Sequence, residues 1–193
     1  MGRRLLPIVI AAVVLLLPTS ALAGGEVNLF FGKRDIDDDI LEALEVESPQ
    51  QIGIELTFGH QWPVAIAIDY FQSDDDGSYE YYGYSEKIDA EIQELAVGVR
   101  YLFRKDKTVV PFIGGGLASV KGELSASSGG GSVDDSTIGW WIQGGVNFRI
   151  GKFFNLGVDL RNVSAEVEFE DIVDIEVGGM SYGVLVGFRW GGS

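Results

Sequence analysis

The chain has 193 residues, no cysteine, and 14 Lys and Arg residues against 29 Asp and Glu residues, which gives a net charge of −15. This length predicts a single domain. The absence of cysteine excludes a disulfide framework, a thiolate metal site and a cysteine nucleophile. The acidic balance argues against nucleic acid, whose phosphates need a basic patch.

The N-terminus has the three parts of a secretory signal peptide. Arg3 and Arg4 form a short basic segment, residues 5–18 are almost wholly apolar, and a small-residue motif ends at Ala23. The apolar run is shorter than the roughly 20 residues that a membrane helix needs, and the cleavage motif follows directly. We therefore predict a signal peptide over 1–23 and one barrel domain over 24–193.

Apolar and polar residues then alternate one by one, most clearly over residues 52–59. Successive side chains on a β-strand point to opposite faces, so each such strand has one apolar face and one small or polar face. The polar face is mostly glycine, alanine, serine and asparagine, which suits a narrow polar interior. The apolar face then needs lipid, as in a transmembrane β-barrel.

The pattern predicts an all-β fold, an eight-stranded antiparallel up-and-down barrel, or meander. The predicted strands cover residues 25–33, 51–60, 63–72, 91–103, 109–122, 137–150, 153–166 and 178–190. Short connections alternate with long ones at 34–50, 73–90, 123–136 and 167–177, which is typical of short periplasmic turns and long extracellular loops. A phase shift over 163–169 suggests a bulge.

The polar faces of these strands carry charges of both signs. The inward positions are Glu26, Glu55, Asp69, Glu94, Arg100, Arg149, Asp159, Arg161 and Arg189. Eight strands leave an interior that side chains just fill, so we favour a plug of ion pairs over a gated ion-passing pore. We expect Glu26 and Arg189 to pair where the last strand closes on the first.

Aromatic residues gather near the predicted strand ends and suggest two girdles at the membrane–water interfaces. At the short-turn side they are Phe58, Trp62, Tyr101, Phe103, Phe112, Phe148, Phe153, Phe154, Phe188 and Trp190, and at the long-loop side they are Tyr70, Trp140 and Tyr182.

The long loops are acidic, with Asp35 and residues 37–39 in the first and residues 74–80 in the second. Oxygen-rich turns can hold calcium, but a solvated loop is the simpler interpretation. The tyrosines at 79, 81, 82 and 84 suit either a binding surface or a hairpin that continues above the membrane. The sequence leaves these two alternatives open.

Sites for catalysis, metals or cofactors are not predicted. His60 is the only histidine and falls in a short turn, so a Ser-His-Asp arrangement is not indicated. The same count excludes a multi-histidine metal site. The glycines at 114–116 are not followed by Gly-Lys, so they are no phosphate-binding loop.

The chain resembles the small eight-stranded outer-membrane barrels of the OmpA-like, OmpX-like and OmpW-like kind. The resemblance rests on the signal peptide, the eight alternating runs, residues 111–116 (PFIGGG) and the closing residues 187–190 (GFRW). It implies a monomer in the outer membrane of a Gram-negative-type bacterium, in contact with outer-membrane lipid, lipopolysaccharide and the barrel-assembly machinery. It favours a non-enzymatic structural or surface-interaction role through the acidic loops. The alternative is a small channel for ions or small apolar molecules.

Overall fold

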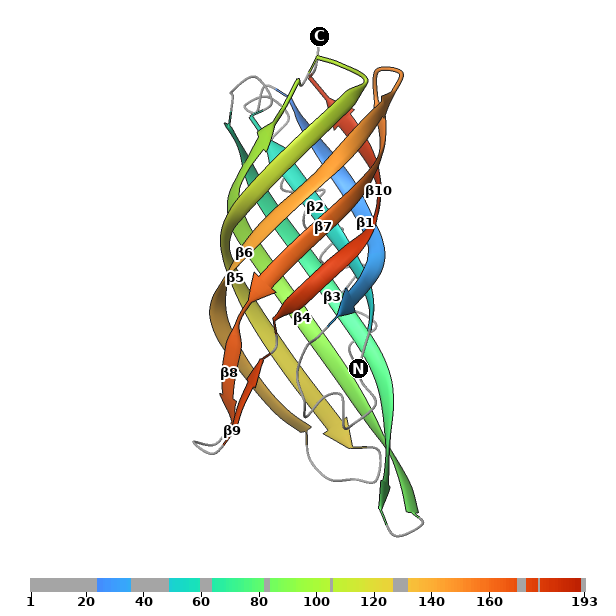
Figure 1. Ribbon diagram of the computed structural model, residues 1–193, viewed down its shortest axis with the longest axis vertical. Coiled ribbons are helices and arrows are strands. Elements are labelled where there is room, and N and C mark those ends of the chain that lie inside the picture. The colour runs from blue at the N-terminus through green and yellow to red at the C-terminus, as the bar shows by residue number, and fades with distance from the viewer. Residues whose placement is uncertain are drawn as a thin grey trace.

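Eight long strands form a closed antiparallel barrel (Figure 1). The computed structural model describes residues 24–35, 49–59, 64–81, 84–104, 106–126, 132–169, 173–176 and 178–191. The barrel strands are β1 (Gly25–Asp35), β2 (Gln50–Phe58), β3 (Val64–Tyr81), β4 (Tyr84–Leu102), β5 (Val109–Ala126), β6 (Ser132–Ile150), β7 (Phe154–Ser164) and β10 (Gly179–Trp190). A separate hairpin pairs β8 (Glu166–Phe169) with β9 (Val173–Glu176).

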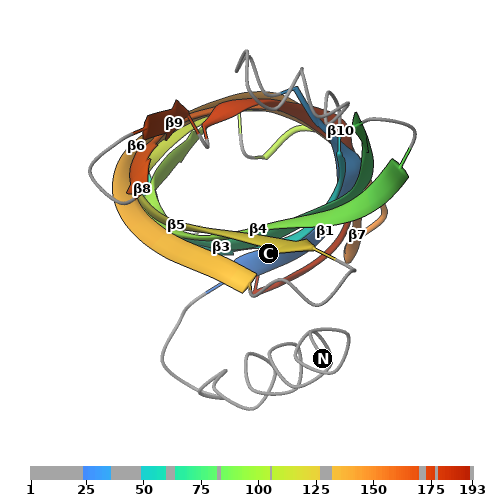
Figure 2. The ribbon, with the colours of Figure 1, turned by 90° about the horizontal axis from the view of Figure 1, so that it is seen from below.

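The strands follow one another around the barrel in chain order, and β10 closes the wall against β1. Seen along its axis the wall is a closed, flattened ring (Figure 2). The predicted eight-stranded meander is therefore confirmed. No helix among the described residues is long and apolar enough to cross a membrane. The predicted signal peptide lies outside the described residues.

Four strands continue well beyond their predicted ends. β3 and β4 stay paired to Tyr81 and Tyr84, so most of the predicted second loop is a hairpin of strands. β5 and β6 also extend, to Ala126 and from Ser132, into the predicted third loop. Alternating hydrophobicity marks a strand only where one of its faces is apolar and the other polar, as in a barrel wall with one face against lipid. These extensions lack that alternation, so the sequence pattern missed the extension of β5 and β6, and it offered the β3–β4 hairpin above the membrane only as one of two alternatives.

The end of the seventh strand differs from the prediction in another way. β7 keeps a continuous register with both neighbours to its end, so the phase shift marks no bulge. The strand stops at Ser164, and after Ala165 the chain leaves the barrel wall as β8. The predicted fourth loop, 167–177, thus contains most of the β8–β9 hairpin.

Large apolar side chains are exposed on the outward face of the barrel, where a soluble protein would place polar groups. They include Ile66, Ile68, Leu95, Val97, Val99, Ile113, Leu117, Ile142, Leu156, Val158, Leu160, Val184 and Val186. Strand β2 is the exception, because its outward Ile54, Leu56 and Phe58 are buried and pack with Val27 and Trp190. An apolar belt of this extent requires lipid, so the barrel is transmembrane.

Exposed aromatic side chains cluster at the short-turn end of this belt. Tyr101 packs against Phe103, and Phe188 packs between Phe153 and Phe154. Trp140 and Tyr182 are exposed farther along the barrel. Phe112 does not belong to a girdle, because it is buried inside the barrel. Trp62 lies outside the described residues.

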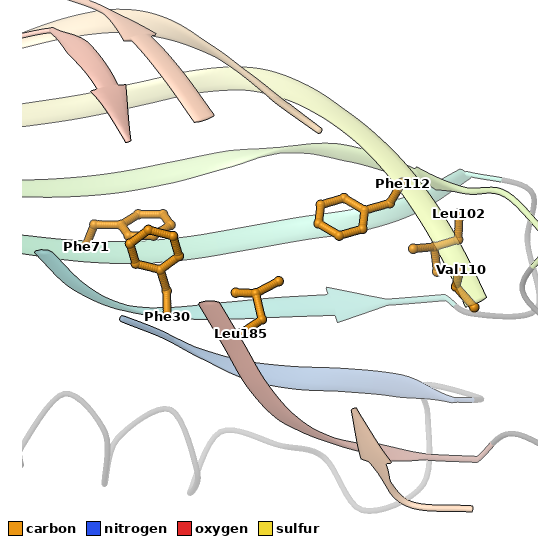
Figure 3. Packing of buried hydrophobic residues seen from close by; sticks show 6 residues of the cluster. All are labelled: Phe30, Phe71, Leu102, Val110, Phe112 and Leu185. Carbon is orange, nitrogen blue, oxygen red and sulfur yellow. The ribbon is translucent and has the colours of Figure 1, made fainter. Parts of the chain in front are cut away.

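The interior also holds apolar side chains that share the inward face with polar ones. Phe30 and Phe71 meet edge to face with ring centroids 5.3 Å apart, near Leu185, while Phe112 lies with Leu102 and Val110 towards the short turns (Figure 3). Glycines on adjacent strands make room for the rings: a Cβ at Gly183 would lie 2.6 Å from Phe30. Large residues therefore face small ones across neighbouring strands.

Candidate functional site

The charged residues predicted to face inward all lie on barrel strands, and these strands alternate in burial except for β2, which carries Glu55. Glu26, Glu55, Asp69, Glu94, Arg100, Asp159 and Arg161 are almost wholly buried in the interior. Arg149 and Arg189 are half-buried near the short-turn end. These positions have the parity opposite to the exposed apolar belt, as the pleat of a strand requires.

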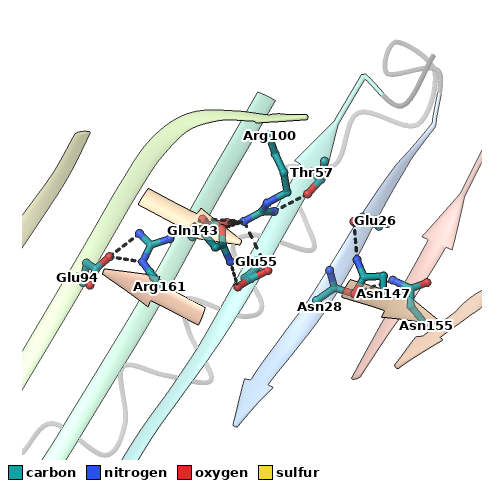
Figure 4. A network of polar contacts seen from close by, with 11 residues as sticks. Glu26, Asn28, Glu55, Thr57, Glu94, Arg100, Gln143, Asn147, Asn155 and Arg161 are labelled. Atoms are coloured by element: carbon teal, nitrogen blue, oxygen red, sulfur yellow. Dashed lines mark hydrogen bonds and ion pairs between the residues drawn. The ribbon is translucent and has the colours of Figure 1, made fainter. Parts of the chain in front are cut away.

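Arg100 on β4 is the centre of one cluster (Figure 4). Its Nη1 donates to Thr57 Oγ1 at 2.6 Å, and its Nη2 donates to Gln143 Oε1 at 2.6 Å and to Asp69 Oδ2 at 3.1 Å. Glu55 Oε2 lies 3.5 Å from the same Nη2. Gln143 extends the cluster, because its Nε2 donates to Glu55 Oε1 at 2.7 Å.

Arg161 on β7 forms a second cluster next to the first. Its Nε and Nη2 both donate to Glu94 Oε1, at 3.0 and 2.5 Å, and its Nη1 donates to Asp69 Oδ2 at 3.2 Å. The guanidinium also lies over two rings, 4.7 Å from the centroid of Phe71 and 4.3 Å from that of Trp141. Aromatic faces attract a cation and favour the orientation in which it meets both carboxylates.

Arg34 joins this arrangement, although the sequence did not indicate it. Its Nη1 lies 3.2 Å from Glu94 Oε2, and its Nε donates to the Gly178 carbonyl at 3.4 Å. The predicted first strand ended at residue 33, whereas β1 continues to Asp35. The alternation of side chains along the strand could have indicated Arg34, because position 34 continues the inward-facing series Glu26, Asn28, Phe30 and Gly32.

Six side chains thus form a chain of alternating charge, which we call the ion network. In order they are Arg34, Glu94, Arg161, Asp69, Arg100 and Glu55. The contacts cross the lumen: Arg161 on β7 reaches Asp69 on β3, and Gln143 on β6 reaches Glu55 on β2, in each case from one wall to the opposite wall. Pairing on this scale is what buried charges require.

Asp159 is buried beside this network. It faces Arg100 and Arg161 and lies between Gly145 and Gly183 on the neighbouring strands. With Asp159, the described interior holds five carboxylates, Glu26, Glu55, Asp69, Glu94 and Asp159, and five guanidinium groups, Arg34, Arg100, Arg149, Arg161 and Arg189. The two signs therefore balance.

A third group of polar contacts, separate from the Arg100 and Arg161 clusters, lies towards the short turns. Asn147 Nδ2 donates to Glu26 Oε1 at 3.4 Å, and Asn155 Nδ2 donates to Asn28 Oδ1 at 2.8 Å (Figure 4). Glu26 and Arg189 are opposite each other at the β1–β10 seam. The expected ion pair between them is nevertheless absent from the described contacts, because Arg189 Nη2 donates to the Gly151 carbonyl at 3.0 Å.

The remaining predicted features have different outcomes. His60 lies outside the described residues, as do residues 36–48 of the acidic first loop. Residues 74–80 belong to strand β3, so they form no calcium-binding turn of the kind considered from the sequence. Within the described residues, no group of three or more His, Cys, Asp or Glu residues could hold a metal ion.

Comparisons with known proteins agree with this architecture. Neisserial surface protein A, from Neisseria, has a crystal structure with a TM-score of 0.56 at 15% identity, covering 86% of this chain and 94% of that one. OprG from Pseudomonas aeruginosa gives a TM-score of 0.64 at 10% identity, covering 89% and 97%. Ail from Yersinia pestis, solved with the heparin analogue sucrose octasulfate, gives 0.56 at 13% identity, covering 88% and 100%. At such identities the likeness shows the fold alone.

A search of curated proteins finds no match. The family described as "Outer membrane protein beta-barrel domain" matches residues 9–189, which is nearly the whole chain. Together with the closed barrel and its exposed apolar belt, this match identifies the chain as a member of the outer-membrane β-barrel family.

Proposed function

We propose that this protein is a non-enzymatic outer-membrane barrel with a closed lumen, which acts at the cell surface through its strand extensions. The observation that carries the proposal is the ion network, whose contacts join opposite walls of the barrel. The largest buried side chains, including Trp141, Arg34, Arg100 and Arg161, point into the same narrow interior. A lumen filled in this way supports a structural or interaction role.

The strand extensions make the proposed interaction surface acidic. Residues 73–92, around the β3–β4 hairpin, contain seven carboxylates and one basic residue, Lys87. The register aligns four acidic positions in one row across four strands: Asp74, Glu91, Glu123 and Asp134. Like charges directly opposite one another destabilise a sheet, and a cationic partner would relieve that repulsion.

The negative charge of the strand extensions also argues against a polyanion as the ligand of this chain. Ail is known in complex with sucrose octasulfate, which is itself strongly anionic. The acidic row here would repel such a ligand, so we propose a basic partner, such as a lysine-rich protein segment. Export through the signal peptide at 1–23, assembly by the barrel-assembly machinery, contact with lipopolysaccharide and a monomeric state complete the proposal.

Binding of polylysine and of heparin to proteoliposomes tests the surface role. Wild type should bind polylysine and not heparin, and neutralising the row with D74N, E91Q, E123Q and D134N should abolish binding. The matched control is D106N, which removes a carboxylate in a short turn. Unchanged polylysine binding by the row variant would reject this surface.

Single-channel recording in planar bilayers tests the closed lumen. Wild type should be silent at neutral pH. R161A removes the contacts to both Glu94 and Asp69 and should produce openings. Steady conductance of wild type would overturn the closed lumen and favour the alternative, a small channel for ions or small apolar molecules.

A further inference from the structure

Basic residues gather along one part of the short-turn rim. The β4–β5 turn carries Arg104 and Lys107, and the β6–β7 turn carries Lys152, all three exposed. The two turns lie side by side, because the Arg149 amide donates to the Thr108 carbonyl at 2.8 Å.

Arg189 continues this part of the rim onto β10. Its amide donates to the Phe153 carbonyl at 2.7 Å, and its Nη2 donates to the Gly151 carbonyl. The ends of β4, β5, β6, β7 and β10 are consecutive in the barrel. They therefore form one continuous basic arc, in which Asp106 is the only exposed carboxylate among the described residues.

The aromatic girdle follows the same arc. Tyr101 and Phe103 pack edge to face at 4.7 Å, and Phe153 stacks on Phe188 at 5.7 Å with an interplanar angle of 7°. These rings are exposed on the outward face and belong at the boundary between hydrocarbon and headgroups. Arg104 and Lys107 follow Phe103 in the β4–β5 turn, and Lys152 directly precedes Phe153 in the β6–β7 turn, so these three residues are close in the chain to rings of the girdle.

The rest of the rim lacks this combination. At the ends of β1, β2 and β3, the described residues include no exposed lysine or arginine. At the other end of the barrel the extensions are strongly acidic. The basic arc is therefore a local feature of a chain whose net charge is −15.

We propose that the basic arc, formed by Arg104, Lys107 and Lys152 beside the aromatic girdle, binds the phosphate headgroups of anionic phospholipids in the leaflet next to the short turns. The rings fix the depth of the barrel, and the cations then meet the phosphates directly. Basic side chains at a membrane surface attract anionic lipid over about a Debye length. The net charge alone predicts the opposite, a repulsion between this protein and an anionic membrane.

The basic arc and the net charge thus predict opposite effects of anionic lipid, and denaturant unfolding in vesicles can distinguish them. Full-length protein is refolded into phosphatidylcholine vesicles and into vesicles in which part of the phosphatidylcholine is replaced by phosphatidylglycerol. Wild type should be more stable in the anionic vesicles at low salt, and the gain should shrink at high salt. In R104Q/K107Q/K152Q, the ratio of folding constants between the two vesicle types should fall by roughly fivefold per charge removed.

Two controls keep the proposal falsifiable. K33Q loses one positive charge at the opposite end of β1, where Lys33 is exposed, and it should keep the full gain. Inorganic phosphate added to the phosphatidylcholine sample should give no gain, and a gain from phosphate alone would assign the arc to a small free anion. The proposal is overturned if wild type shows no gain, or if the triple variant keeps it while remaining folded in phosphatidylcholine.

Discussion

Arg161 and Glu94 face each other across the barrel interior, and two nitrogens of the guanidinium, Nε and Nη2, donate to the same carboxylate oxygen. Both side chains are fully buried. Glu94 also meets Arg34, and Arg161 also meets Asp69. This pair is therefore the junction of the ion network.

Removing one member of this pair should be strongly destabilising. R161A or E94A leaves a buried charge with fewer partners, which costs about 3–5 kcal/mol in a fully buried setting and less where water enters. The double variant should cost less than the sum of the single variants, because the partner charge is removed as well. Denaturant titration of protein refolded into vesicles gives all four free energies of unfolding, and strict additivity would contradict the contact.

The seam between β1 and β10 should behave differently. Glu26 and Arg189 are opposite in register, but Arg189 binds the Gly151 carbonyl and Glu26 accepts from Asn147. We expect E26A and R189A to show a smaller coupling than R161A and E94A, because no contact between Glu26 and Arg189 is among those described. E26A and N147A should show coupling in the same titration. A large coupling between Glu26 and Arg189 would mean that the two charges pair in the membrane.

Strand parity should decide the effect of two adjacent substitutions. Val97 is 53% exposed on the outward face, whereas Ala96 is fully buried beside Asp69. V97R places a charge against lipid and should cost about 2–4 kcal/mol near the midplane. A96S adds one hydroxyl to a polar interior and should be nearly silent. Equal tolerance at both positions, measured by unfolding in vesicles, would place the apolar face away from lipid.

The orientation in the membrane can be tested on whole cells. We expect the long strand extensions to be extracellular and the short turns to be periplasmic. A cysteine that replaces Ser128 should react with an impermeant thiol reagent, and one that replaces Asp106 should not. The chain has no native cysteine, so each label reports one position. The opposite reactivities would reverse the topology.

The sequence predicted those parts of the fold in which lipid imposes alternation. Ile142 and Gln143 are adjacent, yet one is exposed and the other is buried, and this contrast is readable from residue type. The extension from Asp75 to Tyr81 has no such alternation of apolar and polar residues in its sequence. Its pairing with residues 84–90 therefore had no periodic signal.

The inward charges could be predicted from parity, but their partners could not. Glu26 and Arg189 are opposite each other in register, but each binds another group. The length and direction of the two side chains determine which groups they can contact. The positions of the aromatic rings inside the barrel could not be predicted for a related reason. Phe30 shares the polar face, and it fits there because Gly32 on the same strand and Gly183, which is opposite Gly32 on β10, leave room for the ring. Recognising such a match requires the register between strands, which one sequence does not supply.

The ion network also has a consequence for the order of folding. Glu94 on β4 meets Arg34 on β1 and Arg161 on β7, at sequence separations of 60 and 67 residues. No hairpin contains both members of either pair, so these charges stay hydrated until distant strands come together. Contacts of such long range form late, because the chain must first close large loops. Loss of water from the interior and closure of the wall should therefore occur in one cooperative step.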